Sequence, residues 1–392
     1  MKILCITSRV PWPLEKGDKL RMYHQLRNLG KKHEVILCAI NDTKLHPDAE
    51  KELKKFCSEI HIYSQSKITT LFNLAKGLFS GIPFQVAYFT NSSARKKIHS
   101  LITEKKPDRI YCQLIRTAEY ARDEKQIPRT LDYMDIFSKG VERRIEKVNF
   151  FYRWVFRMEW KRLLRYEEKI FSEFNALTII SEQDRDLLPV KNPQRVVVIP
   201  NGVDTDFFSP MKAEKDYELL FNGNMNYPPN IESAVYIAKK ILPLIWKDKP
   251  NVRLLISGAN PSAEVLALQS EKITVTGWVD DVRKSFARSR ILVAPMQSSI
   301  GLQNKLLEAM AMKIPCVTTT LSNNAVKAIP DSQILVADTA EQFSVQIQLL
   351  LNHPEKSEQL GENGYRMVHE RFNWENTCAL LEKTIMHSSV KN

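Results

Sequence analysis

The sequence lacks any long apolar run. No apolar stretch approaches the ~20 residues that a membrane-spanning helix requires, and the opening stretch MKILCITSRV reaches Arg9 too soon for a secretory signal. With 43% hydrophobic and 26% charged residues and a mean hydropathy of −0.31, the composition also excludes a disordered chain. Because 392 residues suffice for two hydrophobic cores, we expect a cytoplasmic protein of two domains.

Cysteine pairs are absent as well. The six cysteines form no CxxC motif and no histidine motif accompanies them. Cys5, Cys38, Cys112 and Cys316 lie in apolar, strand-like runs. This pattern favours buried free thiols over zinc ligands or disulfides.

The common phosphate-binding fingerprints are also missing. The sequence contains no GxGxxG after a strand, no GxxxxGK(S/T) and no HExxH. A dinucleotide oxidoreductase or a P-loop enzyme therefore finds no support. An anion site can still form where a strand ends and a helix begins, because free amides and the helix dipole both favour negative charge.

Acidic residues are scarce relative to basic ones only in the first half. Residues 1–200 carry 37 Lys and Arg against 24 Asp and Glu, a formal charge of +13, whereas residues 201–392 carry −1. Such a basic surface attracts nucleic acid, an anionic membrane or an acidic substrate.

Short β-branched runs alternate with longer amphipathic stretches, which is typical of βαβ units and parallel sheets. A polar, turn-rich segment at 204–216 separates two groups of runs, so we predict an α/β protein with domains at 1–205 and 206–373. Two doubly wound domains would place the carboxyl ends of their strands, where ligands bind, on a shared cleft. The predicted strands are 2–8, 34–40, 108–115, 129–134, 176–181, 195–200, 217–223, 252–258, 272–277, 290–295, 314–320 and 333–337.

One strand-to-helix junction offers the residues for a nucleotide site. A strand ends at Pro295, a loop contains Gly301, and a helix is predicted to begin near Leu302. Amides of the loop and first turn can face a diphosphate, Lys305 adds a cation, and Glu308 can accept hydrogen bonds from both hydroxyls of a ribose. The alternative is a solvated ion pair between Lys305 and Glu308.

Several motifs of the sequence form a recognisable set. They are VVIPNGVDTDFFSP at 197–210, LFNGNMNYPPN at 220–230, ISGANPSAEV at 256–265, TGWVDDVRKSFARSRILVAPM at 276–296, GLQNKLLEAMAMKIPCV at 301–317 and ERFNWENTCALLEKTI at 370–385. This set resembles the fourth family of retaining glycosyltransferases (group 1), and within it the sugar transferases of bacterial exopolysaccharide systems. The resemblance implies the GT-B fold, in which two doubly wound Rossmann-like domains face a cleft, with a C-terminal helix at 374–392 packed back on the first domain.

The resemblance also implies a donor site in the second domain. The donor is a nucleotide-diphosphate sugar, bound as co-substrate, and no cofactor is expected. Glu308 would bind the ribose, Val279 would meet the base, and Gly223 would approach the diphosphate. Gly301, Leu302 and Gln303 would face the sugar and diphosphate through backbone amides. The other predicted donor-binding residues of this domain are Asn224, Asn304 and Lys305.

The first domain contributes a loop and a strand end. RVPWPLEKGDKLRMYHQL resembles the family's first loop, in which Gly17 lets the backbone close over the donor phosphates and Asp18 opens the helix. Asp132 and Asp135 end a strand at the cleft edge, where either could bind a hydroxyl of the acceptor or sugar, so they are the candidate catalytic residues. Many relatives carry a histidine where this chain has Met134.

Two departures from the family concern charge. Ile300 stands where the family's first glutamate contacts the transferred sugar, and the turn GNMNYPPN has no cation. Lys305 is the predicted replacement for the missing cation, with Arg9, Lys19 or Arg21 reaching across the cleft.

Several carboxylates and hydroxyls have a purely structural alternative. Asp135 or Ser138 could cap the following helix, and capping is favoured for Ser181 and Asp184. The carboxylates at 204–206 resemble a metal-binding pair but lie in the predicted hinge, so no metal is expected. Amides, a helix N-terminus and cations can meet the charge of a leaving diphosphate without one.

The segment 141–171 combines aromatic residues with basic charge. From Lys147 to Arg165 six positive residues accompany one acid, Glu159. Helical spacing gives two apolar faces, which need two partners: the core, and an anionic membrane surface or lipid-linked acceptor. The alternative is that both faces pack inside the first domain. One face contains Phe151, Trp154, Val155 and Met158, and the other contains Tyr152, Phe156, Trp160 and Leu163.

The sequence therefore predicts a metal-independent retaining glycosyltransferase of the hexosyltransferase type, peripheral to the inner face of the cytoplasmic membrane. Its acceptor would be a glycan or a polyprenyl-linked molecule in bacterial surface polysaccharide synthesis. One alternative is a nucleotide-sugar epimerase on the same fold, against which the NGVD hinge and LEAMA helix argue. Another is a basic nucleic-acid-binding protein, but no RNA-binding signature is present and no nucleic acid is expected as partner.

Overall fold

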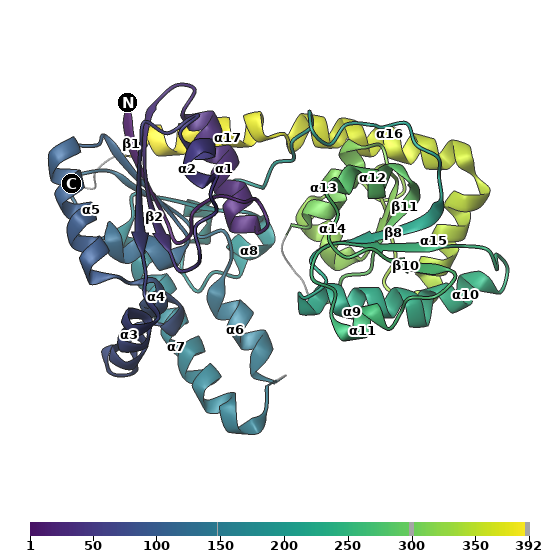
Figure 1. The fold of residues 1–392 in the computed structure, drawn as a ribbon, viewed down its shortest axis with the longest axis horizontal. Coiled ribbons are helices and arrows are strands. Elements are labelled where there is room, and N and C mark those ends of the chain that lie inside the picture. The colour runs from purple at the N-terminus through teal and green to yellow at the C-terminus, as the bar shows by residue number, and fades with distance from the viewer. Residues whose placement is uncertain (147, 298–301, 389–392) are drawn as a thin grey trace. The chain divides into compact units, whose positions relative to one another are not determined.

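The computed structural model describes residues 1–146, 148–297 and 302–388, which divide into two compact units. One unit comprises Met1–Pro200 together with the segment that begins at Trp374, and the other comprises Asn201–Asn373. Each unit is a parallel sheet covered by helices (Figure 1). The predicted α/β class with two doubly wound sheets is confirmed.

The first unit is built on a sheet of seven parallel strands among the described residues. Its elements are β1 (Lys2–Thr7), α1 (Gly17–Leu29), β2 (Glu34–Asn41), α2 (Ala49–Leu53), β3 (Glu59–Ser64), α3 (Lys67–Ser80), α4 (Phe84–Phe89), α5 (Ser92–Lys105), β4 (Arg109–Gln113), η1 (Ile115–Tyr120), β5 (Arg129–Asp132), α6 (Phe137–Ile145), α7 (Phe150–Glu173), β6 (Ala176–Ile179), α8 (Glu182–Asp186), η2 (Pro193–Arg195), β7 (Val197–Val198) and α17 (Trp374–Met386). The strand order is β3-β2-β1-β4-β5-β6-β7.

The second unit contains a sheet of six parallel strands in its described part. Its elements are β8 (Tyr217–Asn222), α9 (Pro228–Tyr236), the π-helix η3 (Ile237–Ile241), α10 (Leu242–Trp246), β9 (Leu254–Ser257), α11 (Ala263–Leu266), β10 (Ile273–Val275), α12 (Val282–Ala287), β11 (Ser289–Ala294), α13 (Asn304–Ala311), β12 (Cys316–Thr318), α14 (Thr320–Val326), β13 (Leu335–Val336), α15 (Ala340–Asn352) and α16 (Pro354–Arg371). The strand order is β10-β9-β8-β11-β12-β13.

Both faces of the first sheet are buried. In β1, Ile3 and Cys5 enter one apolar core, and Leu4 and Ile6 enter another, because alternate strand residues point to opposite faces. Helices α1 and α17 contribute to the first core, and α5 and α7 contribute to the second. A sheet covered on both sides explains why its strands read as nearly continuous apolar runs.

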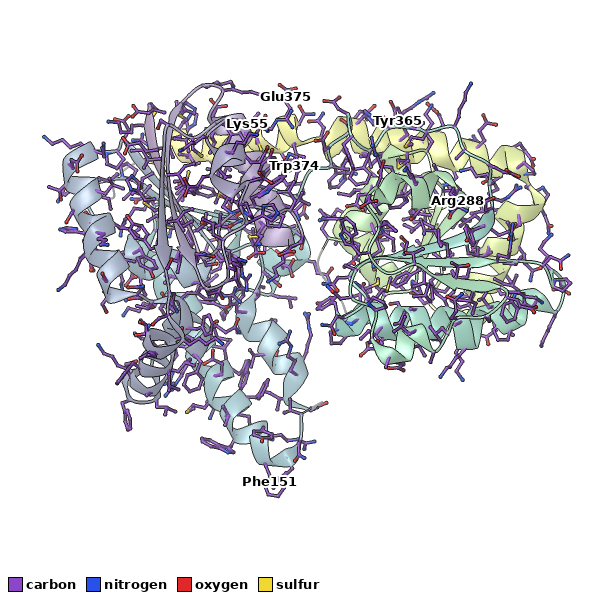
Figure 2. All side chains as sticks on the ribbon, in the orientation of Figure 1. Lys55, Phe151, Arg288, Tyr365, Trp374 and Glu375 are labelled. Carbon is purple, nitrogen blue, oxygen red and sulfur yellow. The ribbon has the colours of Figure 1, made fainter. Side chains whose placement is uncertain are left out.

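The last described helix, α17, packs against α1. The His24 and Trp374 rings stack with centroids 4.6 Å apart, and Lys32 Nζ lies 2.9 Å from a carboxylate oxygen of Glu382. Figure 2 labels Trp374, the first residue of α17. Leu381 is fully buried in the core shared with α1. Helix α17 therefore completes the first unit although it is distant in sequence.

The twelve predicted strands are all present, with ends that differ by a few residues. The sequence pattern does not predict β3, which pairs with β2 at the edge of the first sheet. Its sequence EIHIYS places Glu59 and His61 between apolar residues, and its side chains are only partly buried. An edge strand that is half-exposed lacks the continuous apolar signature of the central strands.

Candidate functional site

The carboxyl ends of β8 and β11 lie at a reversal of strand order. From β8 the sheet continues to β9 and β10 on one side, and to β11, β12 and β13 on the other. Doubly wound sheets bind ligands outside the strand ends at such a switch point. The predicted donor segments follow β8 and β11, so they share this edge. Gly301 and Ile300, which belong to the second segment, lie outside the described residues.

Two glycines end β8 and β9 in close contact. A Cβ added to Gly258, whose φ is +143°, would lie 1.8 Å from the carbonyl oxygen of Gly223. A Cβ on Gly223, whose φ is +152°, would lie 2.7 Å from Asn230 Nδ2 and 3.3 Å from Lys305 Nζ. Without these side chains, the backbone of the turn stays open beside the Lys305 amine.

Lys305 is buried at this turn. Its Nζ donates to Asn230 Oδ1 at 2.8 Å and lies 4.4 Å from the centroid of the Phe221 ring. Asn230 Nδ2 in turn donates to the carbonyl of Asn224 at 2.9 Å, which sets the orientation of the Asn230 amide. A solvated ion pair with Glu308 is therefore the wrong description of Lys305. Sequence reasoning missed Asn230, whose role depends on contacts distant along the chain.

Glu308 follows Lys305 by one turn of α13 and is partly exposed. Desolvation by the surrounding protein raises the pKa of Glu308 to about 7, and the charge of Lys305 opposes this rise. Desolvation likewise lowers the pKa of Lys305 to about 7, and the charge of Glu308 opposes this fall. Near neutral pH, binding of an anionic ligand would therefore favour the protonated, charged form of Lys305. Binding of a hydroxyl-bearing ligand would favour the ionised form of Glu308.

Helix α13 begins at Asn304, two residues later than the predicted start at Leu302. Gln303 occupies the N-cap position in an extended conformation, and Leu302 packs against the core. Asn304 Oδ1 accepts a hydrogen bond from Asn201 Nδ2 at 3.4 Å. The N-terminal end of α13, with its backbone donors and positive dipole end, thus points to the switch point.

Val279 lines a pocket of about 430 Å³ beside β10 and α12. Trp278, which is 70% exposed, lines the same pocket. The preceding Gly277 accepts, through its carbonyl, a hydrogen bond from the Gly258 amide at 3.1 Å, so this turn is attached to the switch point. The predicted base-binding position therefore lies next to an indole ring and a cavity.

In the first unit, β1 and β4 form the corresponding switch point. Arg9 follows β1, and its Nη1 donates to Asp18 Oδ2 at 2.6 Å. Gln113, which ends β4, donates to the carbonyl of Asp18 at 2.9 Å. Gly17 is the exposed first residue of α1, and a Cβ built on it would meet no atom of the described residues within 4 Å. Asp18 thus orients Arg9 at the sheet edge, and the start of α1 stays open.

The structure corrects the prediction that Asp132 acts on a substrate. The Asp132 carboxylate is fully buried and accepts hydrogen bonds from Arg21 Nε at 2.7 Å and from the Tyr111 hydroxyl at 3.1 Å. Arg21 is equally buried, so it is not a cation that can reach a ligand. Lys19 is also buried, and its Nζ lies 3.2 Å from a Glu15 carboxylate oxygen.

Asp135 lies exposed in the turn after β5. Its Oδ1 accepts from the Ile136 amide at 2.9 Å. Desolvation by neighbouring protein raises the pKa of Asp135 to about 6, and the nearby Asp184 carboxylate adds to the rise. The preceding Met134 has a φ of +58°, and such strained non-glycine residues cluster at functional sites. Asp135 is therefore an exposed carboxylate at this edge of the first sheet.

Glu167, rather than Asp135 or Ser138, satisfies the first amides of α6. Its carboxylate accepts from the Ser138 amide at 3.1 Å and from the Ser138 hydroxyl at 2.5 Å. The capping alternative for Asp135 and Ser138 is therefore wrong. Ser181 does cap α8, accepting from the Asp184 amide at 3.0 Å, so that prediction is confirmed.

Sequence reasoning also missed Arg116, which follows β4. Its guanidinium carbon lies 4.8 Å from the centroid of the Phe89 ring and 4.7 Å from that of Phe137, and Nη2 donates to Gln85 Oε1 at 3.1 Å. Burial and the charge of Arg9 lower the pKa of Arg116 to about 10. No local motif marks this residue, because its contacts come from separate helices.

Comparison with known proteins gives a family match for the second unit. Residues 216–353 match the family model described as "Glycosyl transferases group 1". The chain carries a group 1 glycosyltransferase domain. The matched range runs from just before β8 to just after α15, so this domain contains Gly223, Asn230, Lys305 and Glu308.

Two relatives of this chain differ in how much of it they match. An uncharacterized 44.6 kDa protein in the cps region of Klebsiella pneumoniae is 20% identical over 397 residues, covering 95% of this chain and 96% of the relative. A D-inositol 3-phosphate glycosyltransferase of Segniliparus rotundus is 30% identical over 217 residues, covering 48% of this chain and 46% of the relative.

Solved structures show the fold of the whole chain. Anabaena Alr3699/HepE, solved in complex with UDP and glucose, has a TM-score of 0.70 at 11% identity, covering 98% of this chain and 99% of that chain. Sucrose-phosphate synthase from Thermosynechococcus elongatus has a TM-score of 0.68 at 14% identity, covering 98% of both chains. The glycosyltransferase domain is thus the second half of a GT-B fold.

Proposed function

We propose that the protein transfers a sugar from a nucleotide-diphosphate sugar to a glycan or polyprenyl-linked acceptor, with retention of anomeric configuration. The observation that carries the proposal is the convergence of Gly223, Asn230 and Lys305 at the β8/β11 switch point, one helical turn from Glu308. These groups supply an open backbone, a cation and a hydroxyl acceptor, which a nucleoside diphosphate needs. The structural neighbour HepE was solved with UDP and glucose, which supports a nucleotide sugar as donor.

Each donor contact has a distinct physical role in this proposal. Backbone amides near Gly223 and at the start of α13 donate to the diphosphate oxygens. Lys305 and the positive end of α13 offset the charge that develops on the leaving diphosphate, so we propose a metal-independent reaction. Glu308 accepts hydrogen bonds from the ribose hydroxyls. In the first unit, Asp135 is the candidate to bind a hydroxyl of the acceptor or the transferred sugar.

The proposed setting is bacterial surface polysaccharide synthesis at the inner face of the cytoplasmic membrane. Support comes from the likeness to a protein of the cps region of Klebsiella pneumoniae and from the basic, aromatic start of α7. In the described ranges, no helix has the length and hydropathy needed to cross a bilayer.

A nucleotide panel tests the proposed function. A ligand at 100 times its dissociation constant should stabilise the folded protein by about 2.7 kcal/mol, which for a unit of this size raises Tm by roughly 5–11 °C. We expect one of UDP, GDP, ADP and CMP to produce the largest shift in thermal unfolding, and the matching nucleotide sugar to be consumed only with an acceptor. No shift with any nucleotide would overturn the proposal, and sugar epimerisation without acceptor would favour the epimerase alternative.

Changing Lys305 to alanine should weaken nucleoside diphosphate binding by roughly tenfold while leaving nucleoside binding nearly unchanged, because only the diphosphate carries charge. Calorimetric titration of the wild-type and variant proteins with the preferred nucleoside diphosphate and its parent nucleoside measures the two affinities. The exposed Lys239→Ala on η3 provides a matched control. Equal losses for both ligands would mean that Lys305 supports the packing of α13 and does not bind phosphate.

A further inference from the structure

Helix α3 exposes an apolar stripe. Ile68, Leu71, Phe72 and Phe79 are 70%, 70%, 73% and 93% exposed. The last three follow Ile68 by three, four and eleven residues, which places all four on one side of the helix. The Ser66 side chain accepts from the third amide of the helix and thereby caps its start. A contiguous exposed apolar patch of this kind marks an interaction surface.

The start of α7 exposes a second group of apolar side chains. Phe150, Phe151, Tyr152 and Trp154 are between 63% and 77% exposed. Farther along α7 the apolar residues turn inward, and Leu163 is fully buried. The predicted two faces of this segment thus differ along its length: the first turns face outward, and the later turns pack in the core. Figure 2 shows Phe151 at the free end of α7.

Direct hydrogen bonds fix α3 to α7. Two guanidinium nitrogens of Arg162 donate to the carbonyls of Gly77 and Leu78, each at 2.7 Å. The Glu159 carboxylate accepts the first two amides of α4, at 2.7 and 3.1 Å. Helices α3 and α7 extend from the same side of the first unit (Figure 1). We use the name apolar face for the exposed apolar side chains of both helices: Ile68, Leu71, Phe72, Phe79, Phe150, Phe151, Tyr152 and Trp154.

Charge indicates what covers the apolar face. The sequence has no Asp or Glu between 60 and 103, a range that includes all of α3, whereas Lys67 and Lys76 are exposed. Along the outer part of α7, the acid Glu159 is buried against α4 and the basic residues remain. On α3 and the outer part of α7, apolar and aromatic side chains are accompanied by exposed lysine and arginine, and the exposed acid nearest in sequence, Glu146, lies outside both helices. This balance of charge complements an anionic lipid surface.

We propose that the apolar face docks the protein on anionic lipid bilayers, with α3 as a principal contact and the start of α7 as a second one. The inference rests on the proposed function for its purpose, which is to bring the enzyme to a lipid-linked acceptor. The contact itself uses no residue of the donor site. Lipid binding and nucleotide binding can therefore fail independently in experiment.

The main test removes apolar surface from α3. The full chain should co-sediment with phosphatidylglycerol-containing vesicles at low salt and much less with phosphatidylcholine vesicles. The double change Phe72→Ser and Phe79→Ser should weaken this partition by about tenfold or more, because both rings lose apolar contact. The matched control, Ile329→Ser with Val345→Ser, removes exposed apolar side chains from the second unit and should bind like the wild type.

A second variant separates charge from apolar contact. Arg153→Glu, Arg157→Glu and Lys161→Glu should release the protein from anionic vesicles, and high salt should weaken wild-type binding in the same way, because the attraction decays within a Debye length. Nucleotide affinity, measured on the same proteins, should stay unchanged. Loss of nucleotide affinity together with lipid binding would indicate unfolding, and site-specific labelling of α3 then decides.

Labelling decides whether α3 itself meets lipid. All six cysteines are buried, so a thiol introduced by Ala75→Cys on the exposed side of α3 can be labelled selectively with a polarity-sensitive dye. Its emission should shift to shorter wavelength on anionic vesicles, and the same dye on Val345→Cys should not respond. The proposal is overturned if wild-type protein fails to bind the vesicles, if the dye on α3 is silent, or if the control pair loses as much binding. A concentration-dependent dimer lost in the Phe72 and Phe79 variant would assign the face to a second copy of the chain.

Discussion

Replacing Glu308 by alanine is expected to weaken donor nucleotide binding by roughly ten- to two-hundred-fold, because hydrogen bonds to a charged acceptor contribute about 1.5–3 kcal/mol. The carboxylate lies in a desolvated position one turn from Lys305, where its loss leaves the ribose hydroxyls without their acceptor. Calorimetric titration with the preferred nucleoside diphosphate checks the prediction. Glu358→Ala, on the exposed side of α16, is the matched control. An affinity within about twofold of wild type would contradict the assignment of Glu308 to the donor site.

The pKa values of Glu308 and Lys305 predict how donor affinity depends on pH. Glu308 must be ionised to accept ribose hydroxyls, so donor affinity should fall as pH drops through about 7, the raised pKa of its carboxyl. Lys305 must be charged to meet the diphosphate, so affinity should also fall as pH rises above about 7, its lowered pKa. A nucleotide sugar, whose diphosphate does not titrate in this range, should therefore show a bell-shaped affinity profile. Glu308→Ala should remove the acidic flank, and Lys305→Ala should remove the alkaline flank.

Local sequence patterns suffice to locate the sheet edge that holds the candidate site. The runs YELLFNG and VRLLISG are apolar, short and closed by Gly223 and Gly258, which identifies both buried strands and the turns at their carboxyl ends. Because the parallel strands of one sheet end at one edge, both turns are expected at that edge. That they adjoin follows from the observed pairing of β8 with β9. The sequence pattern did not predict edge strand β3, because its half-exposed residues alternate in polarity and give no continuous apolar run.

The partners of individual side chains could not be predicted in the same way. Lys305 and Asn230 are 75 residues apart, and Arg21 and Asp132 are 111 apart, so their hydrogen bonds depend on how helices pack over the sheets. A carboxylate at a strand end looks the same in sequence whether it faces solvent or the core. Asp135 is exposed, whereas Asp132, three residues earlier, is fully buried. The contacts of Asp132 with Arg21 of α1 and Tyr111 of β4 distinguish the two.

The buried pair of Arg21 and Asp132 leads to the largest expected effect on stability. Both side chains are fully buried, and removing one partner leaves the other charge without compensation in a low-dielectric core. Arg21→Ala should therefore lower the free energy of unfolding of the first unit by about 3–5 kcal/mol. Hydrogen exchange of amides in β1 and β4 measures this unit separately from the second. The control is Arg9→Ala, whose pair with Asp18 is partly exposed and should contribute no more than about 1 kcal/mol.

Asp132 provides the decisive comparison between a structural and a catalytic role. Asp132→Asn keeps the shape of the side chain but removes the negative charge that faces Arg21, so it should destabilise the first unit by an amount similar to Arg21→Ala. Replacing both residues by apolar ones, as Arg21→Met with Asp132→Leu, should recover much of this loss, because buried ion pairs are often replaceable by apolar packing. A catalytic Asp132 would behave differently: Asp132→Asn would abolish sugar transfer at full stability, and the double variant would restore nothing. Because the carboxylate accepts from Arg21 and Tyr111 inside the core, we expect the first pattern.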